Sequence, residues 1–190
     1  MKYTRLEIPE LILCEPLVHS DNRGFVYEAF KKESFNDFLG FDVDFCQDNI
    51  LYSKYGVIRG LHTNTLNFAQ SKLVSVVKGK ILDVAVDFRV GSPNFGKFIC
   101  VELDSMENKQ LFIPRGFLHG FSVLSEDSVV NIKIDRYLAS GESIGVKYND
   151  KDLDIDWKLD NQDIILSDTD KKLTSFKKTK SPFIYGKNYY

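Results

Sequence analysis

The sequence has few cysteines, little net charge and no long run of apolar residues. Its three cysteines, Cys14, Cys46 and Cys100, are odd in number and scattered, which argues against a disulfide framework and predicts buried free thiols in a reducing compartment. No apolar stretch is long enough to span a bilayer, and the first residues lack the apolar region of a signal peptide. We therefore expect a cytoplasmic protein that has no membrane partner.

The charges are almost balanced. Lysine and arginine total 25 against 27 aspartates and glutamates, for a formal net charge of -2. Such a balance provides no large positive field to hold a nucleic-acid backbone, so nucleic acid is not an expected partner. Any phosphate that the protein binds should be small and held locally.

The spacing of apolar residues predicts an all-β protein. Between residues 45 and 134 they recur mainly with period two, separated by short turn signals, as in a barrel or sandwich. Helical signals are confined to residues 31–40, which end at Gly40, and to residues 167–173. We expect one domain over residues 1–190, with a loosely packed lysine- and tyrosine-rich tail over about 171–190.

One segment of this pattern places carboxylates among apolar residues. In residues 81–88, Ile81, Asp83, Ala85 and Asp87 alternate with an entirely apolar set on the other strand face. Carboxylates in this pattern are typical of a solvated sheet face, but they also fit the polar interior of a barrel. The spacing alone does not separate these two interpretations.

Two of the three histidines lie in suggestive contexts. His62 ends "RGLH", and His119 ends Pro114-x-Gly116-x-x-His119, which is similar to the second motif of cupin barrels. The first motif of a metal-binding cupin would add a histidine and a glutamate, whereas this chain continues with Thr63-Asn64. Because too few donors remain for a catalytic metal, we expect neither a metal nor another cofactor.

Six segments, in order, carry a more specific resemblance that covers nearly the whole chain: "DNRGFVYEAF", "FCQDNILYSKYGVIRGLH", "AQSKLVSVVKGKILDVAVDFRVGSPNFGKF", "ENKQLFIPRGFLHGFSVLSE", "YNDKDLDIDW" and "LSDTD". The chain resembles the nucleotide-sugar 3,5-epimerases typified by dTDP-4-dehydrorhamnose 3,5-epimerase. This resemblance implies a cupin jelly-roll barrel with a few short helices. It also implies an isomerase that supplies polysaccharide biosynthesis by removing protons beside the ketone of a nucleotide-linked 4-keto sugar.

The resemblance assigns roles to residues. His62 matches the catalytic base, Asp170 the carboxylate that pairs with it, and Lys72 the donor that stabilises the enolate oxygen. It implies a homodimer that exchanges an N-terminal strand, so that Arg23 and Glu28 serve the neighbouring subunit's site. The positions that match substrate-binding residues are Arg23, Glu28, Gln47, Asn49, Arg59, Asp83 and His119.

One departure from the family pattern concerns the acid that returns a proton opposite the base. Where the family has a tyrosine, counting from His119 places Ile132, and counting back from Glu142 places Asn131. Three hypotheses follow. The enzyme inverts C3 alone, which we favour; or another phenol serves as the acid, with Tyr137, Tyr55 and Tyr52 as candidates; or the protein binds a nucleotide sugar without turning it over.

The substrate is defined only as a class. It is a nucleotide-diphosphate 4-keto sugar, with thymidine or guanosine as the base and a 6-deoxyhexose or a heptose as the sugar. A related cupin activity, 3,4-ketoisomerisation, uses a His-x-His pair that the Thr63-Asn64 sequence lacks. A binding module without catalysis predicts that ring hydrogens do not exchange with solvent.

Overall fold

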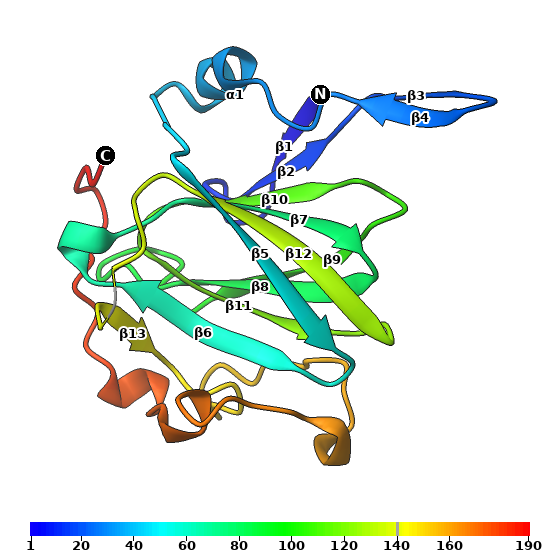
Figure 1. The fold of residues 1–190 in the computed structure, drawn as a ribbon. Coiled ribbons are helices and arrows are strands. Elements are labelled where there is room, and N and C mark those ends of the chain that lie inside the picture. The colour runs from blue at the N-terminus through cyan, green and yellow to red at the C-terminus, as the bar shows by residue number, and fades with distance from the viewer. Residues whose placement is uncertain (140) are drawn as a thin grey trace.

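The computed structural model describes residues 1–139 and 141–190, and β-strands dominate it (Figure 1). The helical elements are α1 (Lys32–Leu39), which ends at Gly40 in a left-handed conformation, and the 3-10 turns η1 (Leu66–Phe68), η2 (Asn161–Asp163), η3 (Asp170–Lys172) and η4 (Phe176–Lys178). The prediction of an all-β barrel with a few short helices is confirmed. The strands are β1 (Lys2–Arg5), β2 (Ile12–Glu15), β3 (Val18–Asp21), β4 (Gly24–Tyr27), β5 (Gln47–Lys54), β6 (Ile58–Asn64), β7 (Lys72–Lys78), β8 (Lys80–Asp87), β9 (Phe98–Asp104), β10 (Gln110–Ile113), β11 (Phe117–Val123), β12 (Asp127–Ile134) and β13 (Ser143–Gly145).

Two antiparallel sheets enclose the interior of the barrel. The six-stranded sheet has the order β1-β2-β10-β7-β12-β5, and the five-stranded sheet has the order β13-β6-β11-β8-β9. Side chains from both sheets form the core between them, including Val74 of β7, Ile81 of β8, Phe121 of β11 and Val130 of β12. The period-two pattern produces this arrangement because it turns alternate residues of each strand toward the facing sheet.

Both sheets are also covered on their outer faces. Phe35 and Leu39 of α1 pack against Phe112 on the outside of the six-stranded sheet. The C-terminal segment packs across the five-stranded sheet and buries Trp157 and Phe183 there. The covering segments therefore turn much of each sheet into a two-sided core.

Strand β8 is buried on both faces, with its apolar set under the C-terminal segment and its carboxylates on the opposite face. Asp83 and Asp87 are fully buried, although both are carboxylates on an alternating strand. Asp83 accepts a hydrogen bond from His119, and Asp87 accepts hydrogen bonds from Arg89. Of the two interpretations of this strand, the polar barrel interior is correct.

The C-terminal tail makes two specific contacts with the barrel: Phe183 is fully buried, and the Tyr190 hydroxyl lies 2.8 Å from Ser71 Oγ. Burial of these aromatic rings anchors the segment at both points.

The expectation that all three thiols are buried is wrong. The thiols are free, but Cys14 is the buried one, while Cys46 and Cys100 are exposed beside or on the edge strands β5 and β9. Within the described residues, no helix is both long and apolar enough to cross a membrane.

A β-bulge in β6 decides which of its side chains face the interior. His62 pairs with His119 and Arg59 with Phe121, so three steps along β6 match two steps along β11. An unbroken strand would send Arg59 and His62 to opposite faces, but the extra residue brings both to one cavity. Gly60 lies in the bulge with φ +117°, and a Cβ there would lie 2.7 Å from both the Gly120 Cα and the His119 carbonyl oxygen.

We expect Gly60→Ala to destabilise the protein by about 3 kcal/mol or more, and Gly91→Ala by about 1 kcal/mol. Both glycines have positive φ, but a Cβ at Gly91 would meet nothing within 4 Å. Urea unfolding of the two variants measures the difference. Equal losses would show that backbone conformation alone, and not the close approach of β11, requires glycine at position 60.

Candidate active site

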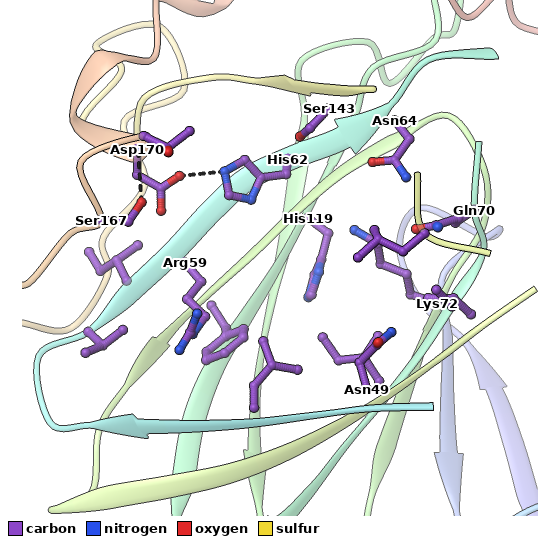
Figure 2. A pocket seen from close by; sticks show the side chains of 18 of the residues that line it. Asn49, Arg59, His62, Asn64, Gln70, Lys72, His119, Ser143, Ser167 and Asp170 are labelled. Carbon is purple, nitrogen blue, oxygen red and sulfur yellow. Dashed lines mark hydrogen bonds and ion pairs between the residues drawn. The ribbon is translucent and has the colours of Figure 1, made fainter. Parts of the chain in front are cut away.

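A cavity of about 740 Å³ lies between the two sheets, in the size range of small-molecule sites (Figure 2). One wall comes from β6 and β11 of the five-stranded sheet, and the facing wall from β5, β7 and β12 of the six-stranded sheet. A C-terminal segment over residues 165–170 closes one side. Its polar lining residues are Asn49, Arg59, His62, Asn64, Gln70, Lys72, His119, Ser143, Ser167, Thr169 and Asp170.

His62 and Asp170 form a hydrogen-bonded pair at this wall, although they are 108 residues apart in the chain. The His62 Nε2 lies 2.6 Å from Asp170 Oδ1, as the dashed line in Figure 2 marks. The backbone N–H of Asp170 donates to Ser167 Oγ at 3.0 Å, which anchors the start of η3. Because Asp170 occupies Nε2, the imidazole has Nδ1 left to accept a proton.

The Asp170 carboxylate is ionised near neutral pH. Burial on its own would raise the pKa of Asp170, but hydrogen bonds from His62, Ser167 and the Gly60 backbone lower the pKa overall. An ionised partner on one ring nitrogen stabilises the imidazolium that forms when the other nitrogen takes a proton. The pair can therefore act as a general base.

Lys72 enters the cavity from the six-stranded sheet, opposite the sheet that carries His62. Burial lowers the pKa of Lys72 to about 8, although the negative charge of Asp83 acts in the opposite direction. Among the described residues, no hydrogen bond or ion pair engages its ammonium group. Lys72 is thus a mostly charged donor at neutral pH that is available to a ligand oxygen.

His119 lies between these groups and is backed by Asp83. Its Nε2 lies 2.6 Å from Asp83 Oδ1, and both side chains are buried. Burial lowers the pKa of His119, and the Asp83 charge offsets only part of this effect, so the imidazole is neutral at pH 7. Asp83 does not line the cavity, and it reaches a ligand only through His119.

The residues expected at the nucleotide end divide into two groups. Arg59 and Asn49 line the cavity, and Gln47 lies behind Asn49, donating to its Oδ1 at 2.8 Å. The Arg59 side chain is held by hydrogen bonds to Ser53 Oγ and the Tyr52 carbonyl oxygen.

The other two residues lie elsewhere. Arg23 and Glu28 are exposed in and beside the β3–β4 hairpin, which projects from the barrel in Figure 1, and neither lines this chain's own cavity. Arg23 instead forms an ion pair with Asp21.

The two residues that the counts from His119 and Glu142 place at the missing tyrosine lie differently. Ile132 lines the cavity and Asn131 does not. Tyr52, Tyr55 and Tyr137 are exposed, and the described lining residues include no tyrosine.

Several lining residues escaped the sequence analysis. Asn64 lies two residues after His62 in β6, so strand alternation was a usable signal for it, whereas Gln70 precedes the start of β7 and has no such signal. The Asn64 amide nitrogen is buried without a hydrogen-bond partner among the described residues. Such a donor is expected where a ligand supplies the acceptor. Ser143 and Ser167 reach the cavity only through the packing of distant segments. No group of three or more metal-ligating side chains occurs in residues 1–139 and 141–190.

Comparison with known proteins identifies the family. The profile of the family described as dTDP-4-dehydrorhamnose 3,5-epimerase matches residues 5–178 of this chain. The chain belongs to this family. Its members include the Shigella flexneri dTDP-4-dehydrorhamnose 3,5-epimerase, which is 41% identical over 90% of this chain and 93% of its own length. Family membership places this protein among the epimerases, which are isomerases.

Solved structures of other family members match the fold closely. The Elizabethkingia anophelis dTDP-4-dehydrorhamnose 3,5-epimerase is 43% identical, covers 94% of this chain and 97% of its own, and has a TM-score of 0.90. ChmJ of Streptomyces bikiniensis, a 3'-monoepimerase in complex with dTDP-quinovose, is 34% identical with a TM-score of 0.84, covering 90% of this chain and 85% of its own. The fold thus accommodates nucleotide sugars and supports epimerases with different outcomes.

Replacing Asp83 with asparagine should lower the pKa of Lys72 below its value of about 8, because the Asp83 charge acts to raise it. The measurement is an NMR titration of isotope-labelled lysine side chains. Asp168→Asn is the matched control, since this exposed carboxylate pairs with Lys171 outside the cavity. An unchanged or higher pKa in Asp83→Asn would show that Lys72 does not sense this carboxylate.

Proposed function

We propose that this protein epimerises a nucleotide-diphosphate-linked 4-keto sugar at C3 alone, as a step toward a surface polysaccharide. The substrate class is a dTDP- or GDP-linked 4-keto-6-deoxyhexose or heptose. The relatives named for dTDP-4-dehydrorhamnose and the dTDP-quinovose complex of ChmJ support a nucleotide sugar as ligand. The observation that carries the restriction to C3 is Ile132, an apolar side chain in the cavity where the family has its tyrosine acid.

The proposed reaction begins with proton removal by His62. The C4 ketone acidifies the hydrogen on C3, and Nδ1 of His62 takes that proton while Asp170 holds the other ring nitrogen. The electron pair of the broken C–H bond moves to the ketone oxygen and forms an enolate. Lys72 donates a hydrogen bond to that oxygen, and the low polarity around its ammonium strengthens this stabilisation.

The substrate is oriented by groups at the two ends of the cavity. Arg59 offers its planar guanidinium to the diphosphate, and Asn49 lies across the cavity from it. His119, neutral and fixed by Asp83, presents a hydrogen-bonding edge to a sugar hydroxyl. These contacts bring C3 beside His62. The orientation of the imidazole itself is set by its hydrogen bond to Asp170.

We also propose that the protein is a homodimer that exchanges its N-terminal hairpin. The β3–β4 hairpin forms a sheet of only two strands. Its Phe25 and Val26, together with Leu17 just before β3, are exposed apolar side chains, at 61%, 67% and 67% exposure. A two-stranded hairpin with exposed apolar side chains is marginal on its own in water, so docking on another subunit stabilises it. Arg23 and Glu28 would then reach the partner's cavity.

Exchange of ring hydrogens tests the proposed reaction. By proton NMR in deuterium oxide with dTDP- and GDP-linked 4-keto sugars, we expect the C3 hydrogen to exchange with inversion at C3, while the configuration at C5 is retained. Ile132→Tyr should add inversion at C5 by restoring a phenolic acid, whereas the matched control Ile132→Phe should not. Wild-type inversion at both carbons would identify a full 3,5-epimerase, and exchange at neither carbon, despite binding, would identify a binding protein.

Subunit complementation tests the exchanged hairpin. Arg23→Ala and His62→Asn homodimers should each lose most epimerase activity, about 100-fold for the base variant. Mixed dimers formed by refolding the two together should regain activity, because one of their two sites combines an intact Arg23 with an intact His62. No recovery in mixed dimers verified by mass spectrometry would contradict the exchange.

A further inference from the structure

Inversion at carbon requires a proton donor on the face opposite the base. With Ile132 in the cavity, that donor cannot come from position 132. The need for such a donor rests on the proposed function. The candidates are the side chains on the cavity wall that faces His62, which belongs to the six-stranded sheet.

The register of β7 and β12 places Lys72 beside position 132. Ile132 pairs with Val74, and Ile134 pairs with Lys72, so Lys72 is a diagonal neighbour of Ile132 on the same sheet face. A tyrosine at position 132 would extend its hydroxyl into space that the shorter isoleucine leaves open. Lys72 lines the same cavity as Ile132, and Figure 2 shows Lys72 on the far side of His119 from His62.

The other groups on this wall do not carry an acidic proton. Asn49 and Gln70 are amides, and Leu51, Ile132 and Ile134 are apolar. His119 comes from the same sheet as His62, and its Nε2 is engaged by Asp83. Of the described residues that line the wall facing His62, Lys72 is the one that titrates.

We propose that Lys72 is the general acid of this enzyme and delivers a proton to C3 on the face opposite His62. After His62 removes the C3 hydrogen, the enolate electron pair forms a new C3–H bond with a proton of the Lys72 ammonium, which becomes a neutral amine. The C4 ketone is restored. The His62 imidazolium then loses its proton to solvent and the Lys72 amine regains one, so the cycle consumes no other reactant.

The surroundings of Lys72 suit this second role. The charge of Asp83 acts directly on Lys72, and His119, His62, Arg59 and Asp170 are the other titratable groups among the described residues that line the same cavity. His119 is neutral because burial lowers its pKa. Burial lowers the pKa of Lys72 to about 8, so the group can both lose and regain a proton near neutral pH. An ordinary exposed lysine holds its proton too tightly for this purpose.

The test separates proton removal from inversion. Lys72→Arg keeps the positive charge and hydrogen-bonding capacity, but a guanidinium does not release a proton near neutral pH. In deuterium oxide, we expect this variant to exchange the C3 hydrogen within about tenfold of the wild-type rate, with retained configuration, while inversion falls about 100-fold or more. Adding Ile132→Tyr to Lys72→Arg should restore inversion.

A chemically modified variant tests whether the larger side chain of arginine lowers inversion for steric reasons. Lys72→Cys, made with Cys46→Ser and Cys100→Ser to remove the exposed thiols, is alkylated with either bromoethylamine or its trimethylammonium analogue. Both adducts restore a positive charge, but only the amine adduct carries a transferable proton. We expect inversion from the amine adduct alone.

The outcomes distinguish this inference from the proposed function. Inversion by Lys72→Arg at the wild-type rate, or by both adducts equally, would show that solvent or another group supplies the proton. If exchange and inversion fall equally in Lys72→Arg and in the trimethylammonium adduct, the role of Lys72 would be limited to stabilising the enolate oxygen. A wild-type protein that exchanges no ring hydrogen would overturn the proposed function itself and this inference with it.

Discussion

The β-bulge at Gly60 is the constraint on which the site depends. A regular strand alternates its faces, so residues three apart, such as Arg59 and His62, point in opposite directions. The bulge adds one residue against β11 and turns both side chains into the same cavity. The Gly60 backbone also helps to lower the pKa of Asp170. One local distortion thus brings Arg59 and the His62–Asp170 pair to the same cavity.

Most charged groups buried inside the barrel are paired with a group of opposite charge or a hydrogen-bond donor. Asp87 is paired with Arg89, and Asp83 with His119, so most buried charges and rings have partners at hydrogen-bond distance. Lys72 differs from these pairs, because its ammonium faces the cavity without a hydrogen bond or ion pair to the described residues and the charge of Asp83 offsets only part of its desolvation. An unpaired, half-buried cation is typical of a functional site, since a ligand oxygen completes its interactions.

Ile132 is compatible with the family's architecture. Its apolar side chain fits the barrel interior, and the two sheets pack as in the solved relatives. Under the proposed function, what differs is the supply of protons on the wall that faces His62. The same fold includes a 3'-monoepimerase, which shows that the number of inverted centres varies without a change of scaffold.

The sequence by itself determined the fold class, the family and the helix that ends at Gly40, because alternation and turn residues act locally and the motifs lie in contiguous segments. It also indicated His62, Asp170 and Lys72 through their motifs. Only the tertiary structure decided that Asp83 lies behind His119, that Ile132 rather than Asn131 faces the cavity, and that the tail is packed. Each of these depends on strand register and on contacts between segments far apart in the chain, and one residue of shift reverses the direction of a side chain.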